Sequence, residues 1–161
     1  MDLPDPKDLP NFGWMTPWLG RGAEPTPAGF KWLADQRFVT VVNLRSEDDT
    51  ESYVDAGLGL THVRFSVEDN AAPTLDQAKD WLTLCADAAR RPIFVHCQSG
   101  HGRTSTFCIL VRLAQGKKLS DAIDEQATRY GFKPKHDVAQ VEFLTGVENL
   151  LKSGALTFPP L

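Results

Sequence analysis

A short segment in the second half of the chain combines residue types that can carry out nucleophilic chemistry on a phosphate. It reads His96-Cys97-Gln98-Ser99-Gly100-His101-Gly102-Arg103-Thr104. A cysteine is a strong nucleophile as a thiolate, and nearby positive charge lowers the pKa of a thiol. The planar guanidinium of an arginine can bind two phosphate oxygens at once. The segment therefore predicts a thiolate at Cys97 that faces a phosphate held by Arg103.

Apolar runs on either side of this segment predict the elements that position it. Residues 92–95 are typical of a short buried strand, and residues 106–111 of a buried helix. The segment then joins a strand end to the first turn of a helix, where backbone N–H groups and the helix dipole bind anions. A free cysteine is more often a core residue, but the glycines and arginine around Cys97 favour the functional interpretation.

The rest of the chain alternates predicted strands and helices. Further strands are expected at 18–23, 38–44 and 60–67. Further helices are expected at 26–36, 48–56, 74–89, 120–130 and 137–151. Thr26 and Ser120 are the predicted N-caps of two of them. We expect the first strand at a sheet edge and the strand at 60–67 beside the one that leads to Cys97.

This alternation predicts an α/β fold with a central, mostly parallel sheet of about four to five strands flanked by helices. The length of 161 residues suits one domain. We expect an extended N-terminal arm at 1–17, a single domain at 18–152 and a C-terminal tail at 153–161.

Composition restricts the partners and the compartment. The formal net charge of −4 argues against nucleic acid as a partner. No apolar run approaches membrane-spanning length, so membrane insertion is not expected. Three cysteines do not form a disulfide framework, and a nucleophilic thiol needs a reducing environment, so we expect a cytoplasmic protein. No metal-ligand spacing is present in the sequence, so no metal and no cofactor are predicted. A monomer is expected.

The string Cys-x5-Arg-Thr, with His96 before the cysteine and Gly100 at the third intervening position, resembles the active-site loop of the cysteine-dependent dual-specificity protein phosphatases. Other segments are similar to the small, atypical, single-domain members of that family. These are Gly22-Ala23-Glu24-Pro25 before a helix, Val41-Val42-Asn43-Leu44-Arg45, and Gln140-Val141-Glu142-Phe143-Leu144. The resemblance extends over about residues 18–144.

The resemblance implies a role for each residue of the loop. Cys97 would be the nucleophile, and Thr104 would donate a hydrogen bond to the sulfur as it leaves. His96 would organise the loop. The phosphate would be bound by backbone N–H groups and by the Arg103 guanidinium, through the residues Gln98, Ser99, Gly100, His101, Gly102 and Arg103.

The leaving group needs a proton from a carboxylic acid on a neighbouring loop. The candidates are Glu68 and Asp69, directly after the strand predicted at 60–67. Residues 67–74 are similar to the acid loop of atypical dual-specificity phosphatases, and the resemblance favours Asp69, with Glu68 as the rival. The acid is not in a Trp-Pro-Asp tripeptide, and no segment is found for a deep phosphotyrosine wall. A shallower cleft is therefore expected, open to phosphotyrosine, phosphoserine and phosphothreonine.

Three other functions stay open. His101 occupies a position where relatives that act on phosphoinositides often have lysine, so a phosphatase of phosphoinositides or other non-protein phosphomonoesters is the main alternative. A rhodanese-like sulfurtransferase also has a cysteine in an anion-binding loop, but the spacing to Arg103 and the loop of Asp69 argue against it. A non-catalytic phosphate-binding module is disfavoured because the cysteine, the arginine and the aspartate are all present.

Overall fold

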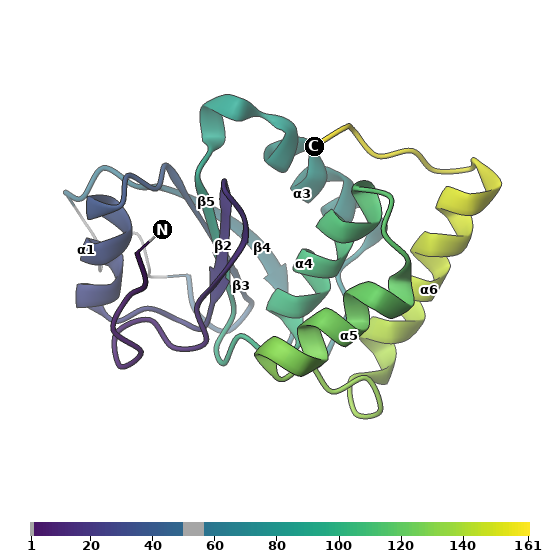
Figure 1. Cartoon of the computed structure of the whole chain (residues 1–161), viewed down its shortest axis with the longest axis horizontal. Coiled ribbons are helices and arrows are strands. Elements are labelled where there is room, and N and C mark those ends of the chain that lie inside the picture. Colours follow the sequence, from purple (N-terminus) through teal and green to yellow (C-terminus); the bar gives the residue numbers. More distant parts are fainter. Residues whose placement is uncertain (1, 50–56) are drawn as a thin grey trace.

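Five strands form one sheet in the order β1-β2-β5-β3-β4, within residues 2–49 and 57–161, the part of the chain that the computed structural model describes (Figure 1). The strands are β1 (Gly13–Thr16), β2 (Leu19–Gly22), β3 (Thr40–Arg45), β4 (Thr61–Val67) and β5 (Ile93–His96). The helices are α1 (Pro27–Asp35), α3 (Leu75–Ala86), α4 (Arg103–Ala114), α5 (Leu119–Tyr130) and α6 (Val138–Ser153), with a 3-10 turn, η1 (Ala88–Arg90). β2, β5, β3 and β4 run parallel, and β1 is antiparallel to β2. The predicted α/β fold with a mostly parallel sheet is confirmed.

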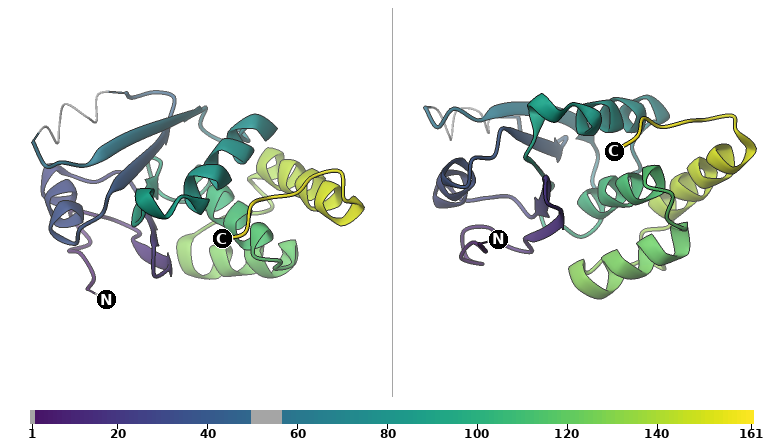
Figure 2. Two further views of the ribbon diagram at one scale, coloured as in Figure 1. Left: turned by 90° about the horizontal axis from the view of Figure 1, so that it is seen from above. Right: turned by 45° about the horizontal axis from the view of Figure 1, so that its top comes forward.

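Helices cover both faces of the sheet. Alternate side chains of a strand point to opposite faces, so each face has apolar side chains that pack against helices. In β5, Phe94 joins a small apolar cluster with Phe30 and Leu33 of α1. Its neighbours Ile93 and Val95 join the larger cluster that α3, α4, α5 and α6 contribute to. Figures 1 and 2 show α1 on one side of the sheet and these four helices on the other. β5 is therefore the buried centre of the fold, and all four of its residues are buried.

Two predictions about strand neighbours are wrong. β2 is not an edge strand, because β1 pairs with it on the side away from β5. The four residues of β1 lie in the predicted N-terminal arm, 1–17, and their sequence, Gly-Trp-Met-Thr, has neither a continuous apolar run nor a clear alternation. β4 does not lie beside β5, because β3 lies between them.

Side-chain caps explain where some helices begin. Thr26 accepts a hydrogen bond from the Gly29 N–H at the start of α1, as predicted. Ser120 does not cap α5, which begins one residue earlier at Leu119. There the Glu148 carboxylate of α6 accepts the Leu119 N–H at 2.8 Å, so a tertiary contact replaces the local cap. Most of the short helix predicted at 48–56 lies outside the described residues.

Within residues 2–49 and 57–161, none of the helices combines the length and the apolar character needed to cross a bilayer.

Candidate active site

The predicted loop joins the central strand of the sheet to a buried helix. Cys97 follows β5 directly, and Arg103 is the first residue of α4. Both side chains are buried, each with a relative exposure of 2%. The N-cap of α4 is Gly102, which has no side chain to bind the first N–H groups of the helix. The loop therefore presents backbone donors and the positive end of a helix dipole beside the cysteine.

The sharp bend of the loop depends on Gly100. Its φ of +77° lies in the left-handed region that side chains other than glycine rarely adopt. A Cβ atom there would also lie 2.8 Å from the carbonyl carbon of Gly22 in β2. Backbone conformation and close packing on the neighbouring strand therefore both require glycine.

A buried arginine on β2, Arg21, binds the backbone of the loop at this bend. Arg21 donates a hydrogen bond from Nη2 to the Gly100 carbonyl oxygen, and from Nη1 to Gln126 Oε1 at 2.8 Å. Its guanidinium lies 4.0 Å from the centre of the Tyr130 ring. Burial lowers the pKa of Arg21. Asn11 also donates to the Gly100 carbonyl, at 3.1 Å, so residues of β2 and the N-terminal segment both hold the loop.

Arg103 is held by a carboxylate that the sequence analysis did not identify. Glu47, two residues after β3, accepts from Nη1 at 2.7 Å and from Nη2 at 3.0 Å. The Val67 carbonyl, at the end of β4, accepts from Nη1 at 2.9 Å. Burial opposes the charge of Arg103, but Glu47 and the nearby Cys97 and Asp69 raise its pKa. The hydrogen bond from Arg103 lowers the pKa of Glu47 to about 2.

The predicted acid loop reaches the same site. Asp69 Oδ1 lies 3.6 Å from Arg103 Nη2, and the Asp69 side chain is 75% exposed. Oδ1 also accepts the Asn70 N–H at 3.1 Å, where the chain turns with a positive φ. Glu68 is exposed. Of the two candidates, Asp69 is the one whose carboxylate contacts the loop that contains Cys97.

The other predicted loop residues divide into buried and exposed ones. His96 is buried, and its Nδ1 lies 3.0 Å from the Cys97 carbonyl oxygen, which accepts the ring N–H. Thr104 is buried and its hydroxyl donates to the Gly22 carbonyl at 3.4 Å. The side chains of Gln98, Ser99 and His101 are exposed.

A buried glutamine connects the acid loop to α6. Gln140 donates from Nε2 to the Ala71 carbonyl at 3.1 Å, and its side-chain amide would lie 3.2 Å from a Cβ at Gly102. The sequence analysis left Gln140 without a role. It packs between the loop of Asp69 and the loop of Cys97.

Among residues 2–49 and 57–161, no group of three or more His, Cys, Asp or Glu side chains has the arrangement of a metal site.

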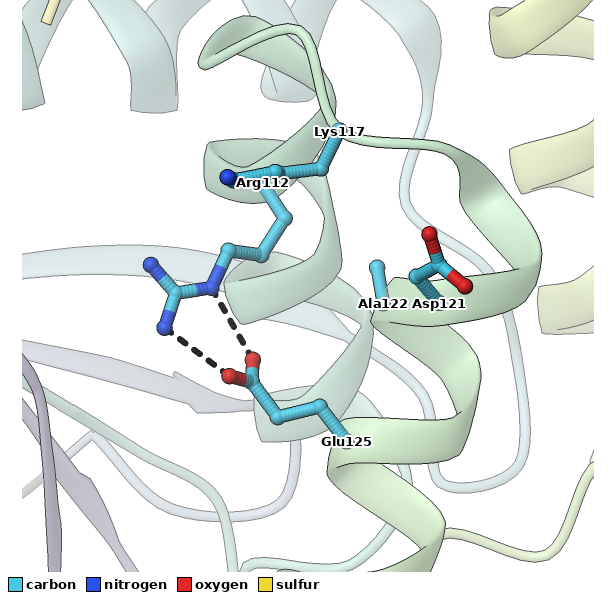
Figure 3. Close-up of a pocket in the computed structure, with 5 residues that line it drawn as sticks. All are labelled: Arg112, Lys117, Asp121, Ala122 and Glu125. Atoms are coloured by element: carbon cyan, nitrogen blue, oxygen red, sulfur yellow. Dashed lines mark hydrogen bonds and ion pairs between the residues drawn. The ribbon is translucent and has the colours of Figure 1, made fainter.

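A pocket at the other end of α4 is a weaker candidate for anion binding. It is lined by Arg112, Lys117, Asp121, Ala122 and Glu125. Arg112 donates from Nε and Nη2 to the two carboxylate oxygens of Glu125, both at 2.9 Å (Figure 3). That edge of the guanidinium is therefore occupied, and the C-terminal end of a helix dipole is negative. The N-terminal end of α4 is the better anion site.

Comparison with known proteins identifies the family. The model of the family described as "DSP-PTPase phosphatase fused to NAD+ Kinase" matches residues 15–144. NAD kinase 2, chloroplastic, of Arabidopsis thaliana is 32% identical over 92 residues, which are 53% of this chain and 9% of that protein. The chain therefore matches only a small part of the length of this relative.

Solved structures share the fold at low sequence identity. TpbA of P. aeruginosa has a TM-score of 0.75 and 21% identity, with 93% of this chain and 94% of that chain covered. The core catalytic domain of the PP-IP phosphatase SIW14 from S. cerevisiae has a TM-score of 0.74 and 19% identity, with 90% and 93% covered. The family model covers most of the chain, including β2, β5 and α4, and the chain belongs to the family of DSP-PTPase phosphatase domains that this model describes.

Proposed function

We propose that the chain hydrolyses phosphomonoesters in two steps, with Cys97 as the nucleophile and Asp69 as the acid and base. The proposal depends above all on one observation. Cys97 and Arg103 are buried at the two ends of one loop, and Asp69 Oδ1 lies 3.6 Å from Arg103 Nη2. Nucleophile, anion-binding cation and proton donor are thus within reach of one bound phosphate. The family match favours this chemistry over sulfur transfer.

In the first step, the Cys97 thiolate attacks the phosphorus atom. The S–P bond forms as the P–O ester bond breaks, and Asp69 gives its proton to the leaving oxygen. The N–H groups of residues 98–103 and the Arg103 guanidinium stabilise the equatorial oxygens in the transition state. The product is a phosphocysteine and a free alcohol or phenol.

In the second step, water attacks the phosphocysteine. Asp69 accepts a proton from that water, the S–P bond breaks, and inorganic phosphate leaves. Thr104 would donate a hydrogen bond from its hydroxyl group to the departing sulfur, in place of its hydrogen bond to the Gly22 carbonyl. The Cys97 thiolate is then restored.

Phosphotyrosine and phosphoserine or phosphothreonine side chains of proteins are the proposed substrates. Asp69 is exposed, and the shallow cleft expected from the sequence would accept side chains of different lengths. TpbA, which shares the fold, has also been solved in complex with pTyr.

Small phosphorylated molecules are the second candidate class. SIW14, a PP-IP phosphatase, is as similar to this chain in fold as TpbA is. The exposed imidazole of His101 lies in the loop itself, where its protonated form could meet a second phosphate group.

The test is a substrate panel with the purified chain and its Cys97→Ser variant. The panel contains a generic aryl phosphate, phosphotyrosyl and phosphothreonyl peptides, and inositol phosphates and diphosphates. We expect the wild-type chain to release inorganic phosphate, with a higher kcat/KM on the peptides, and the variant to bind these substrates without turnover. Normal turnover by Cys97→Ser would refute the nucleophile, and a higher kcat/KM on the inositol compounds would favour the second class.

A further inference from the structure

The peptide bond between Gly100 and His101 is held by two side chains from outside the phosphate-binding loop. Arg21 Nη2, on β2, and Asn11 Nδ2, in the N-terminal segment 2–12, both donate to the Gly100 carbonyl oxygen, Asn11 at 3.1 Å. In a trans peptide, the C=O of one residue and the N–H of the next point in opposite directions. The two donors therefore turn the His101 N–H away from β2 and the N-terminal segment, toward the side of the loop where the phosphate is proposed to bind.

The orientation of this peptide depends on such donors because Gly100 gives it rotational freedom. Gly100 has a φ of +77°, and glycine has more backbone freedom than any other residue. A rotated peptide would point a carbonyl oxygen at the phosphate and remove one N–H donor, so an attraction would become a repulsion. The carbonyl of Gln98 in the same loop accepts the Glu24 backbone N–H at 3.1 Å. Within residues 2–49 and 57–161, by contrast, the Gly100 carbonyl has side-chain donors alone.

Asn11 binds the loop and the end of a helix with one amide group. Its Nδ2 lies 2.9 Å from the Tyr130 carbonyl oxygen and 3.1 Å from that of Gly100, and the Ser99 carbonyl is more distant, at 3.5 Å. An amide NH2 has two hydrogens, so the two shorter contacts use both. The Asn11 backbone has a φ of +54°, which asparagine tolerates better than most residues. Asn11 therefore joins the loop to the last residue of α5.

The end of α5 packs against the loop through other contacts as well. The last carbonyls of a helix have no acceptor role within it, so the Tyr130 carbonyl is available to Asn11. The Tyr130 ring lies 4.0 Å from the guanidinium of Arg21. A Cβ at Gly131 would lie 3.1 Å from the His101 ring. The loop, Arg21 and the end of α5 are therefore packed together, and Asn11 binds them from the N-terminal segment.

We propose that Asn11 is a positioning residue for phosphate binding: its amide fixes the peptide between Gly100 and His101 so that the His101 N–H donates to the phosphoryl group. The inference rests on the function proposed above. The alternative is a purely structural role, in which Asn11 only caps α5 and anchors the N-terminal segment. The contact of Nδ2 with a carbonyl of the loop itself, at 3.1 Å, favours the positioning role.

Two variants separate the amide group from the backbone conformation. Asn11→Gly removes the side chain, and glycine adopts a φ of +54° without strain. Asn11→Asp keeps the shape of the side chain but replaces the NH2 donor by a carboxylate oxygen, which repels the Gly100 carbonyl. We expect Asn11→Gly to bind tungstate about fivefold more weakly than the wild type by calorimetry, and Asn11→Asp about tenfold or more, with kcat/KM on an aryl phosphate falling in parallel. Wild-type affinity in either variant refutes the inference.

The amide signal of His101 separates positioning from a structural role. In ¹⁵N–¹H spectra, the proton of an N–H group shifts downfield when the group donates a hydrogen bond to an oxyanion. We expect this shift for His101 when the wild-type chain is saturated with tungstate, and a clearly smaller shift in Asn11→Asp. An equal shift in the two proteins, or no shift in the wild type, would show that Asn11 does not direct this N–H at the anion and would overturn the inference.

Asp8→Ala is the matched control. Asp8, three residues before Asn11, anchors the same segment to the start of α1, because the Thr26 hydroxyl donates to Asp8 Oδ1 at 3.0 Å. We expect this variant to lose some thermal stability and to bind tungstate like the wild type. A loss of affinity as large as that of Asn11→Gly would show a general loosening of the segment and contradict the inference. Thermal unfolding of each variant excludes a folding defect as the cause.

Failure of this inference differs from failure of the proposed function. If the wild-type chain binds no tungstate and hydrolyses no phosphomonoester, the function itself is wrong, and the inference falls with it. If the wild type does both and the Asn11 variants equal it, the function stands and the positioning role alone is refuted.

Discussion

The Asp69 carboxylate is exposed to solvent and lies near the guanidinium of Arg103. Its carboxylate lies on the open side of the loop, 75% exposed, and is 3.6 Å from the buried Arg103. A phosphate that binds to Arg103 would therefore bring its ester oxygen close to a group that can exchange protons with water. Glu68, its neighbour in the sequence, is exposed as well, so the contact with Arg103 distinguishes the two.

Asp69→Asn should slow turnover most for substrates with poor leaving groups. An asparagine cannot protonate the departing oxygen, and loss of a general acid typically costs about 100-fold to 10,000-fold. For an aryl phosphate with a strongly electron-withdrawing ring, the loss of rate should be much smaller, because the phenolate can leave without being protonated. Steady-state kinetics over a series of aryl phosphates measures this dependence, and the limb of the pH profile that reports the acid should flatten.

Glu68→Gln is the control for this assignment, because it removes the adjacent carboxylate and keeps Asp69. If Glu68→Gln gives the leaving-group dependence and Asp69→Asn does not, the acid is Glu68.

Three parallel strands, β3, β4 and β5, end at the edge of the sheet where the site lies. Glu47 follows β3, Asp69 follows β4 and Cys97 follows β5. Carboxyl ends of parallel strands are the usual location of α/β active sites, because the loops there converge. The strand order β5-β3-β4 puts β3 between the strands that lead to the proposed nucleophile and the proposed acid, and Arg103 contacts residues at the ends of β3 and β4.

Packing of the Cys97 loop on β2 predicts that Gly100→Ala damages the protein. The new Cβ would approach the Gly22 carbonyl carbon to 2.8 Å, on a backbone with a φ of +77°. Strain of this kind costs about 1–3 kcal/mol, and the displaced loop should lower kcat/KM further. Urea denaturation and aryl phosphate turnover measure the two effects.

Gly146→Ala in α6 is the matched control. A Cβ at Gly146 meets nothing within 4 Å, and alanine in a helix interior is favoured over glycine by roughly 0.5–1 kcal/mol. This variant should be slightly more stable and fully active. If Gly100→Ala behaves in the same way, the close approach to β2 is not a constraint on the loop.

Local patterns in the sequence predicted most of these elements, and tertiary contacts explain what they missed. The apolar run at 92–95 predicted β5, since a buried central strand is apolar throughout. β1 was missed because Gly-Trp-Met-Thr has neither a continuous apolar run nor a clear alternation, and the strand forms by pairing with β2. The expectation that β4 lies beside β5 was wrong, because adjacency in a parallel sheet depends on crossovers that local periodicity does not encode.

Site residues divide in the same way. Cys97 and Arg103 could be proposed as site residues from the sequence because one short loop contains them both, with a recognisable spacing. Arg21 and Glu47 lie far from them in sequence and act through buried contacts. The sequence does contain a signal for Glu47, which comes two residues after β3, at the edge of the sheet where the loops converge. Arg21 is a charged residue in β2, a short strand whose residues are all buried, and a buried charge requires a partner.

Carboxylate contacts between the helices on one side of the sheet make the stability of the whole molecule depend on pH. Arg112 of α4 and Glu125 of α5 form a bidentate pair (Figure 3). Burial opposes ionisation of Glu125, but the hydrogen bond and charge of Arg112 lower its pKa overall. The Leu119 N–H, with Lys152 nearby, lowers the pKa of Glu148. Both carboxylates lie in contacts that join helices α4, α5 and α6 on one side of the sheet.

These shifts predict that acid destabilises the fold. A carboxylate with a lowered pKa in the folded state binds fewer protons there than in the unfolded chain. Its contribution is therefore present above the ordinary glutamate value of 4.5 and is lost as the pH falls toward its folded value, which for Glu47 is about 2. The urea midpoint should thus be constant between about pH 6 and 7 and decline below about pH 4.5.

Two variants test the contribution of the Arg112–Glu125 pair. Glu125→Gln should be roughly 1 kcal/mol less stable than the wild type at neutral pH and should lose less stability on acidification. Glu142→Gln, at an exposed position on α6, should follow the wild-type curve. A wild-type midpoint that does not fall between about pH 5 and 3 would mean that these pairs contribute nothing to folding.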